Sequence, residues 1–144
     1  MDDVSRVFIG VDLGDKRIGL SKSDPLGLIA SPVKTIPSAD IGNDIQNIIE
    51  FANECTAQKI VVGLPLLMSG DMGSQATRTR EFVQLLSKNT SIPVITEDER
   101  LSTVDAANIL NSNHPKLNKN KKRKPLDAYA AAIILQRFLD RLNN

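Results

Sequence analysis

The chain has 144 residues, of which 41% are hydrophobic, 24% are charged and 3% are aromatic. This length fits one hydrophobic core, so we expect a single domain over residues 1–144. Its one cysteine, Cys55, excludes an intrachain disulfide and a thiolate zinc site, and the absence of tryptophan argues against a base-stacking platform. We expect a cytoplasmic protein without membrane contact, because the acidic N-terminus is unlike a signal peptide and no apolar run approaches about 20 residues.

Charge is distributed unevenly along the chain. Residues 1–113 contain 10 Lys and Arg against 15 Asp and Glu, whereas residues 114–144 contain 8 against 2. Such a distribution suits a polyanion held beside an acidic, cation-binding centre. A solvated loop next to an amphipathic helix explains the same counts almost as well, so the asymmetry alone decides nothing.

The first part of the chain predicts three strands joined by short turns. Alternating and apolar runs place them, in order, at residues 7–13, 17–23 and 31–36. Pro32 is tolerated at the start of a strand, where a missing N–H does little harm. We expect the first strand to be central in the sheet and the second to lie at an edge, where the polar residues Ser21 and Lys22 are tolerable.

The rest of the chain alternates between helical and strand patterns. Apolar residues recur at helical spacing from Ile41, directly after Asp40, which is placed as the N-cap. The expected elements are, in order, a helix from Ile41, a strand at 59–64, a helix at 74–88, a strand at 92–96, a helix from Ser102, a loop at 111–124 and a helix at 125–142. Three antiparallel strands followed by two further parallel strands make a mixed five-stranded α/β sheet with helices on its faces.

Asp12 is the first candidate site residue. Alternation places it on the same strand face as Phe8 and Gly10, late on a strand whose other residues are apolar. An unpaired charge among apolar neighbours is costly, and a divalent cation is a suitable partner for clustered acids. Asp12 equally suits a structural role as a cap of the turn at 14–16, so this residue alone leaves both interpretations open.

Three consecutive acids, Glu97, Asp98 and Glu99, follow the strand predicted at 92–96. Open α/β sheets bind ligands at the carboxyl ends of their strands, and a row of like charges has only a weak structural reason. Alternation sends Asp98 to one side and its neighbours to the other, so one or two of the three can reach a shared metal. The alternative is a solvated turn partly neutralised by Arg100.

Asp127 is the third candidate and heads an apolar stripe of the final helix that should face the sheet. The stripe continues through Ala131, Ile134 and Phe138. An acid in a first helical turn also gains ~0.3–1 kcal/mol from the helix dipole, which on its own would explain Asp127. Together, Asp12, an acid after the fifth strand and Asp127 could converge at one end of the sheet. Two-metal phosphoryl transfer needs such oxygen ligands and no nucleophilic side chain.

Four short sequence blocks stand in order along nearly the whole chain. They are Gly10-Val11-Asp12-Leu13-Gly14 with Arg17-Ile18-Gly19, Ser23-Asp24-Pro25 and Ala30-Ser31-Pro32; Val62-Gly63-Leu64-Pro65 with Gly70, Gly73 and Ala76; Asp98-Glu99-Arg100-Leu101-Ser102-Thr103; and Lys124-Pro125-Leu126-Asp127 with Ala130-Ala131. In this order and at these separations, the blocks resemble the YqgF/RuvX family of pre-16S rRNA nucleases, also described as Holliday junction resolvase-like proteins.

The resemblance implies a ribonuclease H-like fold and a nuclease that hydrolyses phosphodiester bonds at an acidic site holding Mg²⁺ or Mn²⁺. On the matching positions, the catalytic, metal-binding carboxylates would be Asp12, Glu99 and Asp127, with Asp98 as a rival to Glu99. The family role implies processing of the 5′ end of pre-16S rRNA in ribosome biogenesis, with precursor rRNA or a pre-ribosomal particle as the partner. We expect a monomer or a homodimer.

Basic side chains near these acids are expected to bind nucleic acid. The resemblance puts Arg17 and Arg100 nearest the phosphates, and a basic run just before the final helix could draw a phosphate backbone toward the metals. That run comprises Lys121, Lys122, Arg123 and Lys124. Two positions depart from the family pattern, because Leu67 stands where Asn is usual and Ser69 where Asp is usual. If those groups touch substrate, recognition by this loop differs here.

Three other functions fit parts of the sequence. A DNA junction nuclease would use the same metal chemistry, and symmetric cutting would favour a dimer. An actin-like or sugar-kinase-like ATPase resembles the Asp12-Leu13-Gly14 block, but it needs two such domains, which 144 residues cannot supply. A non-catalytic RNA-binding assembly factor would gain nothing from acids facing phosphates. The sequence does not choose RNA over DNA, since no residue can be assigned to a 2′-hydroxyl.

Overall fold

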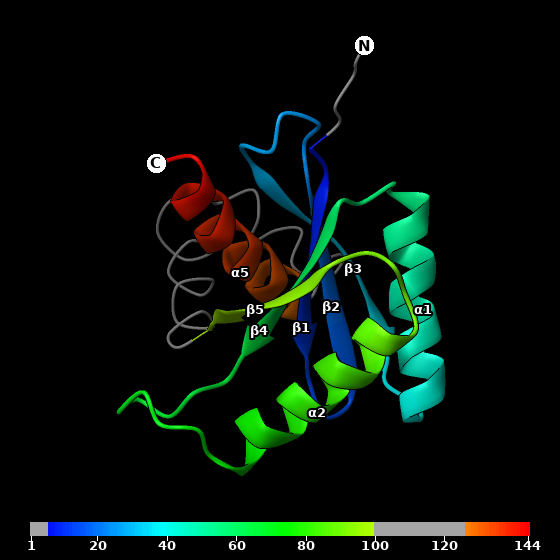
Figure 1. Ribbon diagram of the computed structural model, residues 1–144, viewed down its shortest axis with the longest axis vertical. Helices are drawn as coiled ribbons and strands as arrows, with labels where there is room; N and C mark the ends of the chain where they lie inside the picture. Colours follow the sequence, from blue (N-terminus) through cyan, green and yellow to red (C-terminus); the bar gives the residue numbers. More distant parts are fainter. Residues whose placement is uncertain (1–5, 100–125) are drawn as a thin grey trace.

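The computed structural model describes residues 6–99 and 126–144, which form five strands and three helices. In chain order these are β1 (Phe8–Leu13), β2 (Arg17–Ser23), β3 (Ala30–Pro37), α1 (Ile41–Glu54), β4 (Lys59–Leu64), α2 (Ser74–Lys88), β5 (Val94–Asp98) and α5 (Leu126–Leu142). The strands make one sheet in the order β3-β2-β1-β4-β5. Helices α1 and α2 cover one face of the sheet and α5 covers the other (Figure 1).

The strand pairing confirms the predicted mixed sheet. β1 pairs with β2, and β2 with β3, in antiparallel ladders, whereas β1 pairs with β4, and β4 with β5, in parallel ladders. Short turns join the antiparallel strands, and α1 and α2 supply the longer crossovers that parallel strands require. β1 is therefore central, as predicted, and its carboxyl end lies beside that of β4.

β2 is an inner strand, so the prediction of an edge position is wrong. It lies between β1 and β3, and Ser21 is completely buried beneath α5. The Ser21 hydroxyl donates a hydrogen bond to the Ala131 carbonyl at 2.8 Å, with the Gly10 carbonyl at 3.4 Å. Burial of a hydroxyl group costs little free energy when the group is hydrogen-bonded to a backbone carbonyl, which explains how a polar residue fits an inner strand. Lys22, its neighbour, is exposed.

β5 begins two residues later than predicted and extends into the acidic run. Its parallel ladder with β4 pairs Ile60 with Val94 and Leu64 with Asp98. Pro93 precedes the strand and contributes only its carbonyl, which accepts the Ile60 N–H at 2.9 Å. Pairing with β4, which local hydrophobicity does not reveal, therefore sets the limits of β5 and carries two acids into the strand.

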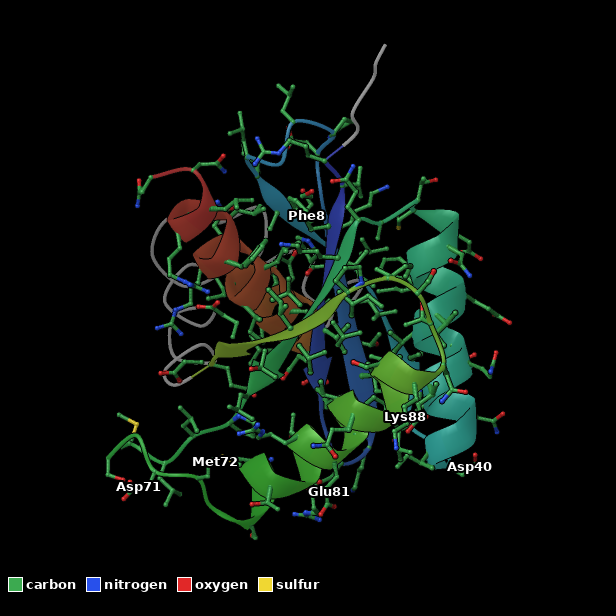
Figure 2. The ribbon with its side chains drawn as sticks, in the orientation of Figure 1. Phe8, Asp40, Asp71, Met72, Glu81 and Lys88 are labelled. Carbon is green, nitrogen blue, oxygen red and sulfur yellow. The ribbon has the colours of Figure 1, made fainter. Side chains whose placement is uncertain are left out.

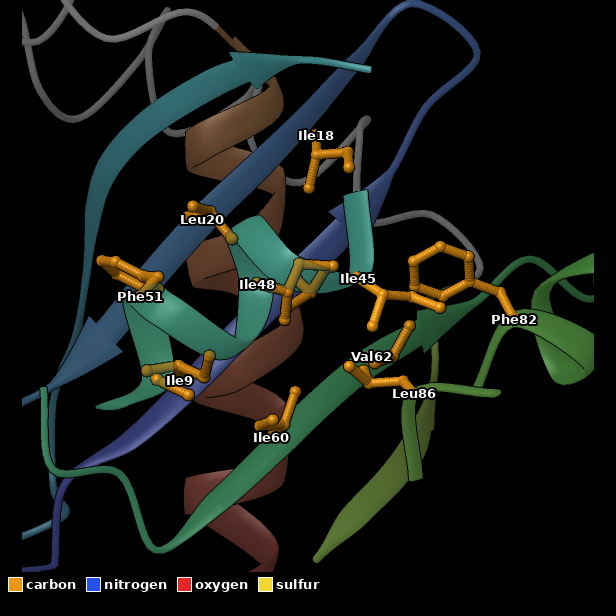
Figure 3. Close-up of a cluster of buried hydrophobic side chains, with 12 residues drawn as sticks. Ile9, Ile18, Leu20, Ile45, Ile48, Phe51, Ile60, Val62, Phe82 and Leu86 are labelled. Atoms are coloured by element: carbon orange, nitrogen blue, oxygen red, sulfur yellow. The ribbon is translucent and has the colours of Figure 1, made fainter. Parts of the chain in front are cut away.

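The α1 and α2 side of the sheet holds the larger hydrophobic core. α1 begins after Asp40, whose carboxylate accepts the Asn43 N–H at 2.9 Å and confirms the predicted N-cap (Figure 2). Figure 3 shows buried side chains of three strands meeting those of both helices. The labelled residues are Ile9, Ile18, Leu20, Ile60 and Val62 from the strands, and Ile45, Ile48, Phe51, Phe82 and Leu86 from the helices. This layer fixes the strands that carry the candidate site.

The apolar stripe predicted for the final helix is confirmed. Ala131, Ile134 and Phe138 are buried against the sheet. The Phe138 ring meets the Phe8 ring edge to face, with 5.5 Å between the ring centroids. The stripe fixes the rotation of α5 about its axis, and with it the direction in which Asp127 points.

Small residues of the strands let α5 approach the sheet closely. A Cβ atom at Gly10 would lie 2.7 Å from the Ala131 carbonyl oxygen, and one at Gly19 would overlap the Asp127 carbonyl oxygen. No side chain can occupy either position without moving the helix. The start of α5 is therefore held directly over β1 and β2.

Several predicted features lie outside the described residues, namely the helix from Ser102, the loop at 111–124, Pro125 and Arg100. Within residues 6–99 and 126–144, no helix is both long and apolar enough to cross a membrane.

Candidate active site

Asp12 is the next-to-last residue of β1 and lies opposite Gly19 of β2 in the ladder. Its carboxyl group is hydrogen-bonded to that of Glu99. The pKa of Asp12 is raised to about 6, first by burial and then by the negative charge of Asp127, while the hydrogen bond with Glu99 lowers it. Asp12 thus carries an electrostatic cost that an adjacent cation would relieve.

Glu99 directly follows β5 and is anchored to the end of β4. Its backbone N–H donates to the Leu64 carbonyl at 3.1 Å. Its Oε2 lies over Gly63, where a Cβ atom would come within 2.7 Å of that oxygen. The pKa of Glu99 is raised to about 8, by burial first, then by the charge of Asp12, their hydrogen bond and the charge of Asp98. Burial and the mutual repulsion of Asp12 and Glu99 therefore disfavour the state in which both carboxyl groups are ionised.

Asp127 lies in the first turn of α5 and is half-buried. Its backbone rests on Gly19, and its Oδ2 accepts a hydrogen bond from Arg17 Nε at 2.7 Å. The negative charge of Asp127 is one of the causes that raise the pKa of Asp12. The three predicted carboxylates thus come from β1, the end of β5 and α5, and Asp12 interacts with each of the other two.

The other two acids of the run at 97–99 have different surroundings. Glu97 is only 8% exposed and forms an ion pair with Arg141 of α5. The sequence argument that three acids in a row lack a structural reason is therefore wrong for Glu97. Its partner is 44 residues away, and no local pattern points to it. The Asp98 carbonyl accepts a hydrogen bond from Arg137 at 3.2 Å.

Glu99 and its rival Asp98 differ in how they interact with the acidic site, and which of them is a metal ligand stays a prediction. Glu99 is hydrogen-bonded to Asp12, whereas Asp98 bears on Glu99 through its charge, the last of the four causes that raise the Glu99 pKa. The predicted alternation agrees with this arrangement, because Glu97 and Glu99 both meet partners on the α5 side of the sheet.

Of the residues predicted to bind nucleic acid, Arg17 is described and lies beside the acids. It is the first residue of β2, and its side chain is exposed apart from the ion pair with Asp127. The others, Arg100, Lys121, Lys122, Arg123 and Lys124, lie outside the described residues.

The loop between β4 and α2 contains the two positions that depart from the family pattern. Leu67 is 53% exposed, and the Ser69 hydroxyl lies 3.2 Å from the Asp71 carboxylate. Figure 2 shows Asp71 and Met72 on this loop, well away from the sheet. The loop starts one residue after Leu64, the residue that anchors Glu99, so it leads outward from the acidic site.

The carboxylate oxygens of Asp12, Glu99 and Asp127 are the type of ligand that a divalent cation prefers. Carboxylate oxygens are the ligands preferred by Mg²⁺ and Mn²⁺, and a cation would offset the repulsion that raises the Asp12 and Glu99 pKa values. Among residues 6–99 and 126–144, however, no three Asp, Glu, His or Cys side chains are grouped closely enough to hold one. In the structure, Asp12 is hydrogen-bonded to Glu99, and Asp127 is paired with Arg17.

A cavity of about 400 Å³ lies on the opposite face of the sheet, between the β1–β2 turn, α1 and α2. Its lining mixes apolar side chains such as Phe82 with charged ones such as Arg78, and it includes none of the three carboxylates. The buried acid in its wall, Asp44, is already held by the Ser38 hydroxyl and the Ala39 N–H.

Residues 6–141 match the family described as "RuvX: Holliday junction resolvase". The chain belongs to the RuvX family. A relative from Gloeobacter violaceus is 42% identical over 132 residues, which is 92% of this chain and 82% of the relative. Another from Clostridium tetani is 41% identical over 137 residues, or 95% and 98% of the two chains. Both relatives carry the name "Putative pre-16S rRNA nuclease". The family predicted from the four sequence blocks is confirmed.

Solved junction resolvases share the fold of this RuvX chain. RuvC of T. thermophilus, in complex with a Holliday junction substrate, matches with a TM-score of 0.64 and 13% identity over 96% of both chains. The fowlpox virus Holliday junction resolvase matches with a TM-score of 0.60 and 11% identity over 94% of this chain and 99% of its own. At such low identity the likeness concerns the fold alone, and it confirms the predicted ribonuclease H-like architecture.

Proposed function

We propose that this RuvX-family protein is a divalent-metal-dependent nuclease that processes the 5′ end of pre-16S rRNA in the cytoplasm. The observation that carries the proposal is the interaction of Asp12 with both Glu99 and Asp127 at the carboxyl end of the central strands. The family description and the names of the relatives support a nuclease that hydrolyses phosphodiester bonds. The relatives' names also support precursor rRNA as its substrate.

In the proposed reaction, Asp12, Glu99 and Asp127 would hold Mg²⁺ or Mn²⁺ through their carboxylate oxygens. When bound, the metal supplies the positive charge that activates water and steadies the leaving oxygen. The backbone of each acid is fixed separately: Asp12 by the β1 ladder, Glu99 by Leu64 and Asp127 by its contact with Gly19. The backbones of the three acids are therefore positioned before the substrate arrives, and only side chains have to adjust, which lowers the entropic cost of reaching the transition state.

Arg17 has the exposure and position to face the substrate phosphate. Its guanidinium lies beside Asp127 at the edge of the acidic site, and this group binds phosphate and carboxylate oxygens with the same planar fork. The basic residues predicted to bind the phosphate backbone, at 100 and 121–124, would extend the contact along the nucleic acid.

The test uses two labelled substrates, an RNA carrying the 5′ extension of the 16S precursor and a four-way DNA junction. Each is incubated with Mg²⁺, Mn²⁺ or chelator and with wild type, Asp12→Asn or Glu50→Gln. Glu50 is exposed on α1, on the opposite face of the sheet, so its variant loses a carboxylate elsewhere and serves as the control. We expect metal-dependent cutting of the RNA by wild type and Glu50→Gln, and a loss of roughly 100-fold or more in Asp12→Asn.

Other outcomes separate the remaining functions. Preferred cutting of the junction would identify the second candidate, a DNA junction resolvase, which the family description favours. If neither substrate is cut, or if Asp12→Asn cuts as well as wild type, the nuclease assignment fails. A non-catalytic RNA-binding role in ribosome assembly would then be the better account.

A further inference from the structure

The ion pair between Arg17 and Asp127 joins two residues that are 110 positions apart in the sequence. Arg17 Nε lies 2.7 Å from Asp127 Oδ2, and the two side chains are 57% and 30% exposed. A pair this exposed contributes little to stability, because water screens it and two long side chains must be ordered. Stability is thus a weak reason for the pair to exist.

The position of the pair is nevertheless imposed by the fold. Gly19, two residues after Arg17 and on the same face of β2, carries the Asp127 backbone directly above it. Docking of α5 therefore places the Asp127 carboxylate within reach of Arg17. The guanidinium occupies an oxygen of an acid whose charge also acts on Asp12.

The consequence is that the acidic site is only partly assembled. Asp12 and Glu99 are hydrogen-bonded to each other, and Asp127 is bonded to a cation of the chain itself. In the parts of the chain that the structure describes, no three potential ligands are grouped to hold a metal. A metal that uses all three acids has to share the Asp127 carboxylate with Arg17 or displace Arg17 from it, because the guanidinium holds Oδ2.

We propose that Arg17 competes with the metal for Asp127, and that a substrate phosphate releases Asp127 by pairing with Arg17 in its place. Metal and phosphodiester then bind cooperatively, and the ligand set is completed when substrate is present. This inference rests on the proposed nuclease function. The exchange replaces one charge-assisted pair of the guanidinium by another of the same geometry, so it carries little energetic cost.

The test is a calorimetric titration of the full-length protein with Mn²⁺, with and without saturating dimethyl phosphate, a phosphodiester that makes no contact beyond the site. In wild type we expect dimethyl phosphate to tighten Mn²⁺ binding about tenfold, and Mn²⁺ to tighten dimethyl phosphate binding by the same factor. In Arg17→Gln we expect Mn²⁺ alone to bind about three- to tenfold more tightly than in wild type, with the coupling lost. Arg17→Lys, which keeps the charge without the fork, should fall between the two.

Arg78→Gln is the matched control, because Arg78 is an exposed arginine of α2 on the other face of the sheet. Its Mn²⁺ affinity and coupling should equal those of wild type. Independent binding of Mn²⁺ and dimethyl phosphate in wild type would overturn the role of Arg17 while leaving the nuclease proposal intact. The role of Arg17 would also be overturned if the Arg17→Gln variant melts like wild type and binds Mn²⁺ no more tightly than wild type does. Failure of wild type to bind Mn²⁺ at all would overturn both.

Discussion

The carboxyl groups of Asp12 and Glu99 have pKa values of about 6 and about 8, against ordinary values of 3.8 and 4.5. At pH values between the ordinary and the raised pKa of each group, the folded chain binds more protons than the unfolded chain. The favourable contribution of these groups is therefore present below about pH 4 and is lost as pH rises through the folded values. A divalent cation would offset the loss by binding the ionised acids, which links stability to the proposed function.

Replacing Asp12 with Asn should stabilise the metal-free protein at pH 8 by on the order of 1–3 kcal/mol. The reason is that Asn removes the negative charge that opposes ionisation of Glu99. The gain should shrink at pH 5, where Glu99 keeps its proton in both proteins. Urea unfolding in chelator at the two pH values measures the difference.

Asp24→Asn is the control, because the pKa of Asp24 is lowered in the folded chain whereas that of Asp12 is raised. The Asp24 carboxylate accepts backbone N–H groups of Ile29, Leu28 and Leu26, and these bonds lower its pKa. Asn at this position should not stabilise the protein at either pH. If instead Asp12→Asn loses stability at pH 8, Asp12 acts as a structural cap of the β1–β2 turn, the alternative that the sequence leaves open.

At the level of elements, the docking of α5 on β2 decides where Asp127 lies. Gly19 to Ala would place a methyl group into the Asp127 carbonyl, which is backbone and cannot turn aside. We expect a loss of about 1–3 kcal/mol in the free energy of unfolding, as for other overpacked positions. We also expect cleavage to fall further than stability explains, because the Asp127 carboxylate moves with the helix.

Gly42→Ala in α1 is the matched substitution for this test. A Cβ atom there meets only Asp40 Oδ1, at 3.4 Å, so stability should be unchanged or raised slightly, since Ala favours helix over Gly. Thermal melting and cleavage rates of both variants measure the effect. Equal behaviour of the two variants would show that α5 tolerates displacement and that its close approach to β2 is unimportant.

Most elements could be predicted because their signals are local. The stripe of α5, the Asp40 N-cap and the limits of β4 follow from spacing and residue type within a few positions. The inner position of β2 and the start of β5 could not, because both depend on which strand pairs alongside. Ser21 illustrates the difference, since the acceptor that makes its burial tolerable is 110 residues away.

For the whole molecule, one end of the sheet gathers acids from three distant parts of the chain. Alternation and the family motifs identified Asp12, Glu99 and Asp127 as candidates, and in the structure Asp12 interacts with the other two. The ion pairs Arg17–Asp127 and Arg141–Glu97 were not predicted, because nothing near either arginine reveals a partner on another element. Arg17 was expected to face phosphate, and its pairing with an acid became visible only in the folded chain.

The central claim is that Asp12, Glu99 and Asp127 together hold the divalent cation that is required for cleavage of the phosphodiester bond. Anomalous scattering from a crystal of the protein with Mn²⁺ and a bound phosphodiester tests it most directly, with Asp127→Asn as the comparison. We predict a Mn²⁺ peak within about 2.5 Å of carboxylate oxygens from all three residues, weakened or lost in the variant. A peak held by Asp98 in place of Glu99, or none at Mn²⁺ concentrations that support cleavage, would contradict the account.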